Sequence, residues 1–168
     1  MQLSVDVLNL VKELRKNNIP YRIYGGTSFY QRKEIKDTLA YFRLAVNPKD
    51  NEALLRALSF PSRGIGDTTM KKVTLCAIEN NQPYLEVMRH PDDYPLEMSG
   101  PMRKKISAFA AMIDEMAVQS EEMDAFRFAE MLLKQTGLTT ALMMDRTTEG
   151  IDRAQNVQEL LNAIREFV

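Results

Sequence analysis

The residues best suited to do chemistry lie in the stretch "SRGIGDTTMKK", where Gly64 and Gly66 flank Ile65. A Gly-apolar-Gly turn between two helices lets the backbone approach a phosphate closely, because no Cβ atom stands in the way. The helix predicted directly after the turn would add unpaired N–H groups and the positive end of its dipole at the same place. The pattern therefore predicts a site that binds a phosphate group.

The side chains around this turn also suit a polyanion. Lys71 and Lys72 fall near the first turn of the following helix, where a cation is unfavourable for the dipole itself unless an anion binds nearby. The predicted phosphate-contacting set is Arg63, Gly64, Ile65, Gly66, Asp67, Thr68, Thr69, Lys71 and Lys72. The tripeptide leaves a second interpretation open, which is a tight helix-helix corner that needs glycine only for packing.

No other group of side chains indicates a catalytic or metal site. Gly25-Gly26 lacks the Lys-Ser/Thr of a Walker loop, and His90 is the only histidine. The acidic residues at 92–93 and 121–124 match no calcium loop and read as solvated loops. Cys76 is the only cysteine, so no internal disulfide is possible, and we expect it to be buried on a helix in a reducing, cytoplasmic protein.

The composition is that of a globular protein with an uneven charge distribution. Of the 168 residues, 45% are hydrophobic and 27% are charged, and no apolar run suits a membrane span or a signal peptide. Residues 1–75 carry 13 Lys+Arg and 7 Asp+Glu (+6), whereas residues 76–168 carry 9 and 16 (−7), which together give the net charge of −1. This asymmetry favours a polyanion partner for the first half, although charge that simply varies along solvated helices would look the same.

Hydrophobic periodicity predicts a mainly α protein with one short strand near the N-terminus. Ile19, Tyr21 and Ile23 alternate and predict the strand, which has no partner strand in the sequence. Helices are predicted at about 4–17, 32–46, 50–60, 68–80, 83–89, 101–120, 124–136 and from 156 to the end. A polar loop, "DRTTEGIDRA", is expected before the last helix, whose apolar pattern reaches Val168 without a stop signal. We therefore expect a piece of a larger protein, or an oligomer that completes itself.

Residues 18–69 closely resemble the superfamily 1 DNA helicases of the UvrD/Rep/PcrA type. The matching segments are "IPYRIYGG", "FYQRKEIKDTLAYFRL", "NPKDNEALLRAL" and "PSRGIG", and "KQTGL" with "QNVQELLNAIREF" looks like the weaker continuation. The resemblance implies that residues 1–58 are part of the second RecA-like motor domain and that residues 59–168 open the helical subdomain inserted into it. It also implies that the Gly-Ile-Gly turn, like a helix-hairpin-helix, grips duplex DNA ahead of the fork.

The resemblance implies further expectations about partners and cofactors. Arg32 and Lys33 would lie on the motor face near the single strand and the nucleotide cleft. The whole protein would be an ATP-dependent 3′-5′ helicase in DNA repair or replication that needs ATP and Mg²⁺, with this chain holding no cofactor of its own. Its partners would be DNA at a duplex-single-strand junction and the rest of the helicase chain, with no membrane contact. Two alternatives are a non-enzymatic helical interaction module, whose corner is purely structural, and a short standalone accessory factor.

The sequence predicts that this chain does not hydrolyse ATP alone, because it carries no Walker loop, no acidic Mg²⁺-binding motif and no arginine-finger segment. The measurement is phosphate release from ATP by the purified chain with and without DNA. DNA-stimulated turnover above the background would contradict the expectation.

Overall fold

The computed structural model describes residues 9–12 and 27–167, and within these ranges it is built from helices and contains no strand. The mainly α prediction is confirmed. The strand predicted at 19–23, Gly25-Gly26 and most of the first predicted helix lie outside the described residues, although residues 9–12 are helical. The elements are α3 (Thr27–Tyr30), α4 (Lys33–Val46), α5 (Asn51–Ser59), α6 (Asp67–Glu79), α7 (Tyr84–Arg89), the 3₁₀ turn η1 (Pro91–Asp93), α8 (Gly100–Ser120), α9 (Ala125–Gln135), α10 (Leu138–Met144) and α11 (Thr148–Phe167).

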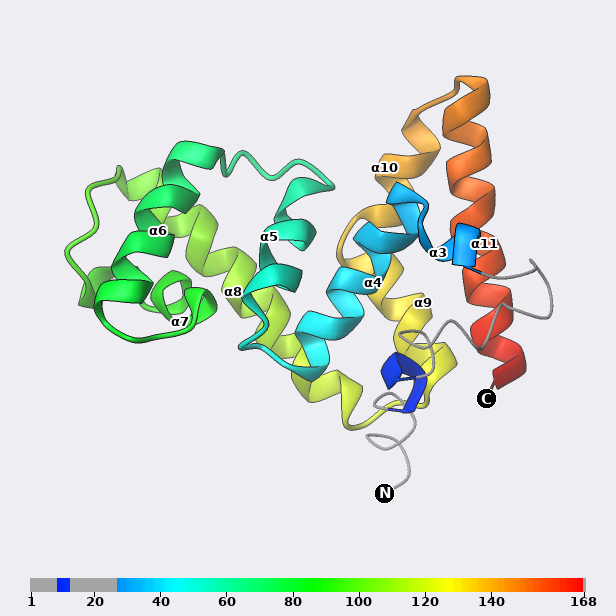
Figure 1. Ribbon diagram of the computed structural model, residues 1–168, viewed down its shortest axis with the longest axis horizontal. Helices are drawn as coiled ribbons and strands as arrows, with labels where there is room; N and C mark the ends of the chain where they lie inside the picture. The colour runs from blue at the N-terminus through cyan, green and yellow to red at the C-terminus, as the bar shows by residue number, and fades with distance from the viewer. Residues whose placement is uncertain (1–8, 13–26, 168) are drawn as a thin grey trace.

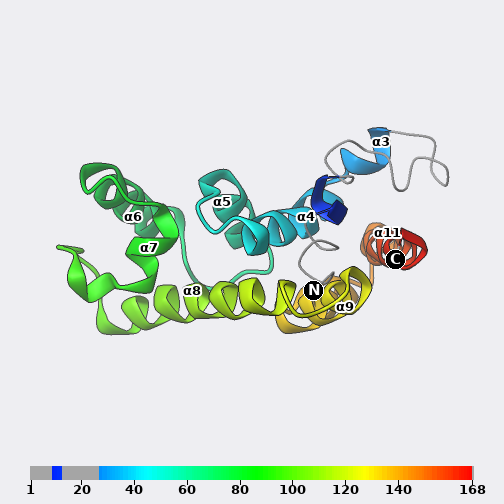
Figure 2. The same ribbon diagram turned by 90° about the horizontal axis from the view of Figure 1, so that it is seen from below.

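The long helix α8 organises the arrangement of the others. Figure 1 shows α6 and α7 beside the first part of α8 at one end of the molecule, and α9, α10 and α11 at the other end. In Figure 2, α8 and α9 run along one side, while α4, α5, α6 and α7 lie along the opposite side. The loop from α5 to α6 dips toward α8 in this view, so the predicted phosphate site lies between elements rather than on one helix.

Short polar side chains begin three of these helices at the positions that the sequence indicates. Asp50 accepts a hydrogen bond from the Ala53 N–H at 3.0 Å, and Asp124 accepts one from the Arg127 N–H at 2.9 Å. Ser99 caps α8 in the same way through the Met102 N–H. Each cap satisfies an N–H group that lacks a partner within its own helix, and replacing such a residue by alanine typically costs about 1 kcal/mol.

Apolar seams on α8 and α4 form the centre of the core. Ile106, Ile113 and Met116 of α8 are fully buried, as their spacing of three and four residues predicts. Phe42 of α4 meets Phe128 of α9 edge-to-face, with ring centroids 5.8 Å apart. No helix in the described ranges is long and apolar enough to cross a membrane.

The structure corrects the sequence prediction at the C-terminal end. Residues 138–144 form α10, which the sequence analysis did not predict, and α11 begins at Thr148 instead of near residue 156. Most of the expected polar loop is therefore the first two turns of a helix. The Thr147 hydroxyl accepts a hydrogen bond from the Gly150 N–H at 3.0 Å, while the Asp145 carboxylate accepts from the Thr147 N–H and hydroxyl. The first turns of α11 are mostly polar. They therefore lack the spacing of apolar residues from which a helix is predicted.

Gly150 permits the close approach of the loop that precedes α11, and we predict that Gly150→Ala destabilises the fold. A Cβ atom there would lie 2.3 Å from Asp145 Cγ and 2.4 Å from the Asp145 carbonyl oxygen. The expected loss in unfolding free energy is about 1–3 kcal/mol, measured by urea denaturation, because overpacking forces the backbone to move. Gly100→Ala is the matched control, since no atom lies within 4 Å of a Cβ at Gly100. Equal unfolding midpoints for the two variants would contradict the prediction.

Candidate nucleic-acid interface

The Gly-Ile-Gly corner is an exposed bend directly before α6. Gly64 has a φ of +73°, in the left-handed region that disfavours residues with a Cβ atom, and it is solvent-exposed. Gly66 is also exposed and has extended backbone as the N-cap of α6. Ile65 between them is half-buried and packs against the core. The apolar residue therefore anchors the bend, and the two glycines face outward.

A run of unpaired backbone donors follows from this geometry. The N–H groups of residues 65–69 donate no hydrogen bond to any residue in the described part of the chain. The helical ladder begins one residue later, where the Met70 N–H donates to the Gly66 carbonyl at 3.1 Å. Asp67 and Thr68 are exposed, and Thr69 is half-buried. Water satisfies such groups in the free protein, and an anion is the ligand that suits several converging N–H groups and a helix N-terminus.

Two of the predicted lysines are placed to add positive charge near this bend. Lys71 is exposed and forms no ion pair or hydrogen bond with the described residues. Lys72 is exposed as well, and its ammonium donates to the carbonyl oxygen of Glu97 at 2.6 Å, which leaves two donors for other partners. The carboxylate of Asp67 stands beside the same amides and opposes the binding of an anion.

Lys105 of α8 is a cation at the corner that sequence reasoning missed. A Cβ atom on Gly64 would lie 2.9 Å from the Lys105 ammonium nitrogen, so this side chain lies directly against the Gly64 backbone. The Lys105 side chain is exposed and has no acidic partner in the described part of the chain. Residues 64 and 105 are far apart in sequence, and only the packing of the α5–α6 loop on α8 brings them together.

Arg63 points into the molecule and not toward solvent. Its Nη2 atom donates to the Tyr41 hydroxyl at 2.7 Å and to the Thr136 carbonyl at 2.8 Å. The guanidinium also lies over the Tyr41 ring at 5.6 Å and over the Phe109 ring at 5.3 Å. Arg63 thus touches α4, α8 and the end of α9, and a contact between Arg63 and DNA stays a prediction.

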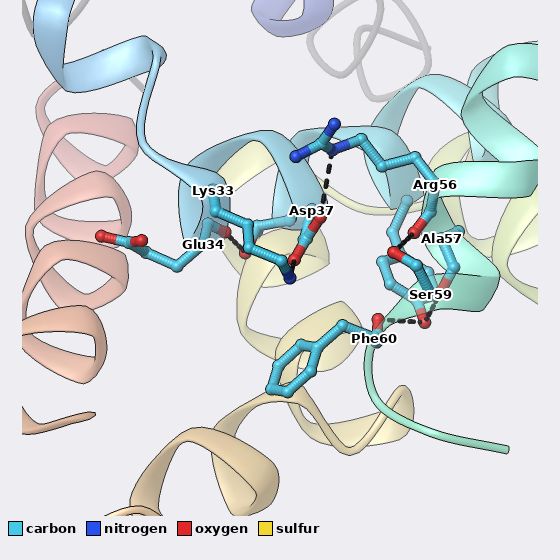
Figure 3. Close-up of polar contacts among 9 residues, drawn as sticks. Lys33, Glu34, Asp37, Arg56, Ala57, Ser59 and Phe60 are labelled. Carbon is cyan, nitrogen blue, oxygen red and sulfur yellow. Dashed lines mark hydrogen bonds and ion pairs between the residues drawn. The ribbon is translucent and has the colours of Figure 1, made fainter. Parts of the chain in front are cut away.

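The other predicted DNA-contacting residues lie at the start of α4, apart from the corner amides. Arg32 is the exposed N-cap residue of α4, and its side chain forms no hydrogen bond or ion pair with the described residues. Lys33 pairs with the buried Asp37 at 2.7 Å and lies 5.3 Å from the centre of the Phe60 ring. Figure 3 shows Asp37 between Lys33 and Arg56, whose Nε atom is 3.0 Å from the carboxylate.

A cavity of about 270 Å³ beside Lys33 is another candidate ligand site, but its charged side chains already have ion-pair or hydrogen-bond partners. It is lined by Lys33, Glu34, Asp37, Phe60, Ala141, Leu142, Asp145, Gly150 and Arg153. Lys33 neutralises Asp37, Arg153 lies 3.2 Å from Asp145, and Glu34 accepts from Asn156 at 2.8 Å. The described residues also contain no cluster of three or more metal-ligating side chains. The exposed corner is therefore the stronger candidate.

Comparisons with known proteins agree with the identity suggested by the sequence. Residues 5–168 match the model of the family described as "UvrD-like helicase C-terminal domain". DNA helicase II of Salmonella typhimurium is 32% identical over 158 residues, which cover 94% of this chain and 22% of that protein. ATP-dependent DNA helicase PcrA of Bacillus subtilis is 30% identical over 154 residues, covering 92% of this chain and 21% of PcrA. The chain thus spans about a fifth of the length of these relatives.

Proposed function

This chain belongs to the family of UvrD-like helicase C-terminal domains, and on that premise we propose that it is the duplex-gripping part of an ATP-dependent DNA helicase. The observation that carries the proposal is the row of N–H groups at residues 65–69, which lie on an exposed corner and have no partner among the described residues. ATP and Mg²⁺ would bind the parent helicase outside this chain. Unwinding in the 3′-5′ direction, in repair or replication, comes from the family resemblance alone.

The proposed contact is with a single phosphate of the DNA backbone. The N–H groups around Ile65, Gly66 and Asp67 would donate to its oxygens, and the Thr68 or Thr69 hydroxyl would add one more donor. An anion at the N-terminus of α6 is stabilised by the helix dipole, and the effect is strongest within the first turn. Gly66 leaves room for the sugar-phosphate backbone, because no atom of the protein lies within 4 Å of the place of its Cβ.

The lysines would strengthen the grip without reading the base sequence. Lys105 lies against Gly64, Lys71 and Lys72 lie near the start of α6, and each could neutralise one phosphate as a flexible point charge. Phosphate contacts carry no information about bases, so we expect binding to be independent of sequence. For a module of this size, the expected Kd is no tighter than about 10⁻⁴–10⁻⁶ M, the usual nonspecific range.

The proposed boundary between motor and subdomain lies near residue 58, at the end of α5. Residues up to 58 would be the piece of the second motor domain, with Arg32 and Lys33 on its face toward the single strand and the nucleotide cleft. Residues from 59 on would be the inserted subdomain that holds the duplex. The α5–α6 loop would then begin where the motor piece ends, so the corner follows the boundary directly.

We predict that Gly66→Val weakens duplex binding at least tenfold and leaves the fold intact. Valine branches would stand where the phosphate approaches, whereas the space on the protein side is open. A valine N-cap costs about 1 kcal/mol of stability, which the urea midpoint of the variant would reveal. Binding is measured by fluorescence anisotropy of a labelled DNA duplex at low salt.

Gly100→Val is the matched control for Gly66→Val, because it adds the same side chain at another exposed helix start with open space around it. It should bind DNA like the unaltered chain. Loss of binding in both variants, or in neither, would contradict the proposed role of the corner. Unfolding of Gly66→Val would instead favour the interpretation in which the glycine serves packing alone.

We predict a second result from the salt dependence of binding. Three neutralised phosphates give a slope of log K against log[salt] near −2.7, from about −0.9 per contact. Lys105→Gln should make this slope shallower by about 0.9, because it removes one counterion-releasing contact. Lys134→Gln is the control, since Lys134 is an exposed lysine at the end of α9, outside the corner. Absent or salt-insensitive binding would favour the alternative of a protein-interaction module.

A further inference from the structure

We propose that Arg63 is a positioning residue that fixes the shape of the corner and does not contact the DNA phosphate. The inference rests on the proposed function, since it concerns how the duplex-gripping corner keeps its shape. It assigns to Arg63 a different role from the one expected from its place in the sequence. We use the name Arg63 joint for the contacts that Arg63 makes with Tyr41, Phe109 and Thr136.

In the Arg63 joint, the guanidinium makes its hydrogen bonds with groups inside the molecule. One nitrogen donates to both the Tyr41 hydroxyl and the Thr136 carbonyl, at 2.7 and 2.8 Å. The guanidinium carbon also lies within cation–π distance of the rings of Tyr41 and Phe109, at 5.6 and 5.3 Å from their centroids. If Nη2 turned outward to a phosphate, it would break these two hydrogen bonds and leave the buried Tyr41 hydroxyl without its charged donor. Lys71 and Lys105 can reach a phosphate without any such loss.

Tyr41 holds the same loop at a second point. Its hydroxyl lies 2.7 Å from the Ala57 carbonyl oxygen and 3.0 Å from that of Phe60, so it donates to the end of α5 while it accepts from Arg63. A hydroxyl has one proton to donate and two lone pairs to accept, which allows both roles together. The segment between residues 60 and 63 is therefore tied at both ends to one side chain of α4.

This double tie matters because the next residue is Gly64. Glycine populates positive and negative φ with similar ease. Gly64 alone therefore does not fix the orientation of the backbone amides that follow it. The Arg63 joint fixes the residue before Gly64, while Ile65 packs on the core after it. With both neighbours held, the left-handed conformation of Gly64 persists, and the exposed N–H groups of residues 65–69 keep fixed positions.

The Arg63 joint also connects the corner to the helix that we assign to the motor piece. Tyr41 lies on α4, and the Lys33 ammonium at the start of the same helix rests over the Phe60 ring, where the loop begins. Phe109 belongs to α8, which also carries Lys105. Movement of α4 relative to α8 would thus displace Arg63 and change the direction of the amides.

The test compares Arg63→Gln, Arg63→Lys and Tyr41→Phe by duplex affinity and salt slope. A positioning role predicts that all three weaken binding by about tenfold with an unchanged slope, since no phosphate contact is removed. Arg63→Lys keeps the charge but loses the flat, stacking group, so it should not restore affinity. The double variant Arg63→Gln/Tyr41→Phe should bind no more weakly than either single variant, because both remove the same interaction.

Arg89→Gln is the control for lost stability. It breaks the pair between Arg89 and Asp114, at 2.7 and 2.8 Å, which joins α7 to α8 away from the Arg63 joint. This variant should unfold at lower urea concentration but keep its affinity for DNA. If Arg63→Gln makes the slope shallower by about 0.9 while Arg63→Lys and Tyr41→Phe bind normally, Arg63 contacts a phosphate and the proposal is overturned.

A second measurement separates this proposal from the proposed function. The ¹⁵N heteronuclear NOE of the Gly64 and Gly66 amides reports fast backbone motion without any DNA. It should fall in Arg63→Gln and Tyr41→Phe but not in Arg89→Gln. If the unaltered chain does not bind DNA, the proposed function is wrong. The NOE values of the Gly64 and Gly66 amides would still test the positioning role of Arg63. Unchanged NOE values in both joint variants would overturn the positioning role.

Discussion

The α5–α6 loop must expose unpaired backbone donors and still keep a single shape, and the contact between Arg63 and Tyr41 meets both requirements. Loops usually gain rigidity by pairing their N–H groups within the protein. Here the N–H groups of residues 65–69 stay free of described partners, so the rigidity has to come from side chains. The hydrogen bond from Arg63 to Tyr41 is charge-assisted and therefore stronger than one between neutral groups, and it supplies that rigidity from the inner side of the loop.

The corner combines neutral donors and mobile charges in a way that suits a repeating polymer. Amide groups at a helix start require one phosphate in one orientation, whereas lysine ammonium groups accept a range of positions. In the proposed complex, the amide groups would set where the DNA backbone sits, and Lys71, Lys72 and Lys105 would tolerate the neighbouring phosphates in a range of positions. Nothing in this set distinguishes one base from another, which fits a protein that has to hold DNA of any sequence.

The sequence predicts those features of the fold that depend on local chemistry. Helices are predicted at about 50–60, 101–120 and 124–136 from helical spacing, and the structure has α5, α8 and α9 at these places. The exposed Gly64-Ile65-Gly66 bend is also predictable, because it depends on glycine in the left-handed region and on the helix that follows. The start of α11 is not, since its first turns are polar and depend on the fit of Gly150 against Asp145. The inward direction of Arg63 and the place of Lys105 depend on tertiary packing, of which the sequence gives no local sign.

The length of α8 has a mechanical consequence for the corner. Its 21 residues make a rod about 30 Å long, which packs on α7 near its start and on α4 and α9 farther along. Lys105 and Phe109, both in the first half of this rod, touch Gly64 and Arg63. A force applied to the Gly64-Ile65-Gly66 corner would therefore be transmitted to α8, a rigid helix packed in the core, and not to a flexible segment. Tension from a moving duplex would tilt α8 as a lever, and the far arm of that lever lies among α4 and α9.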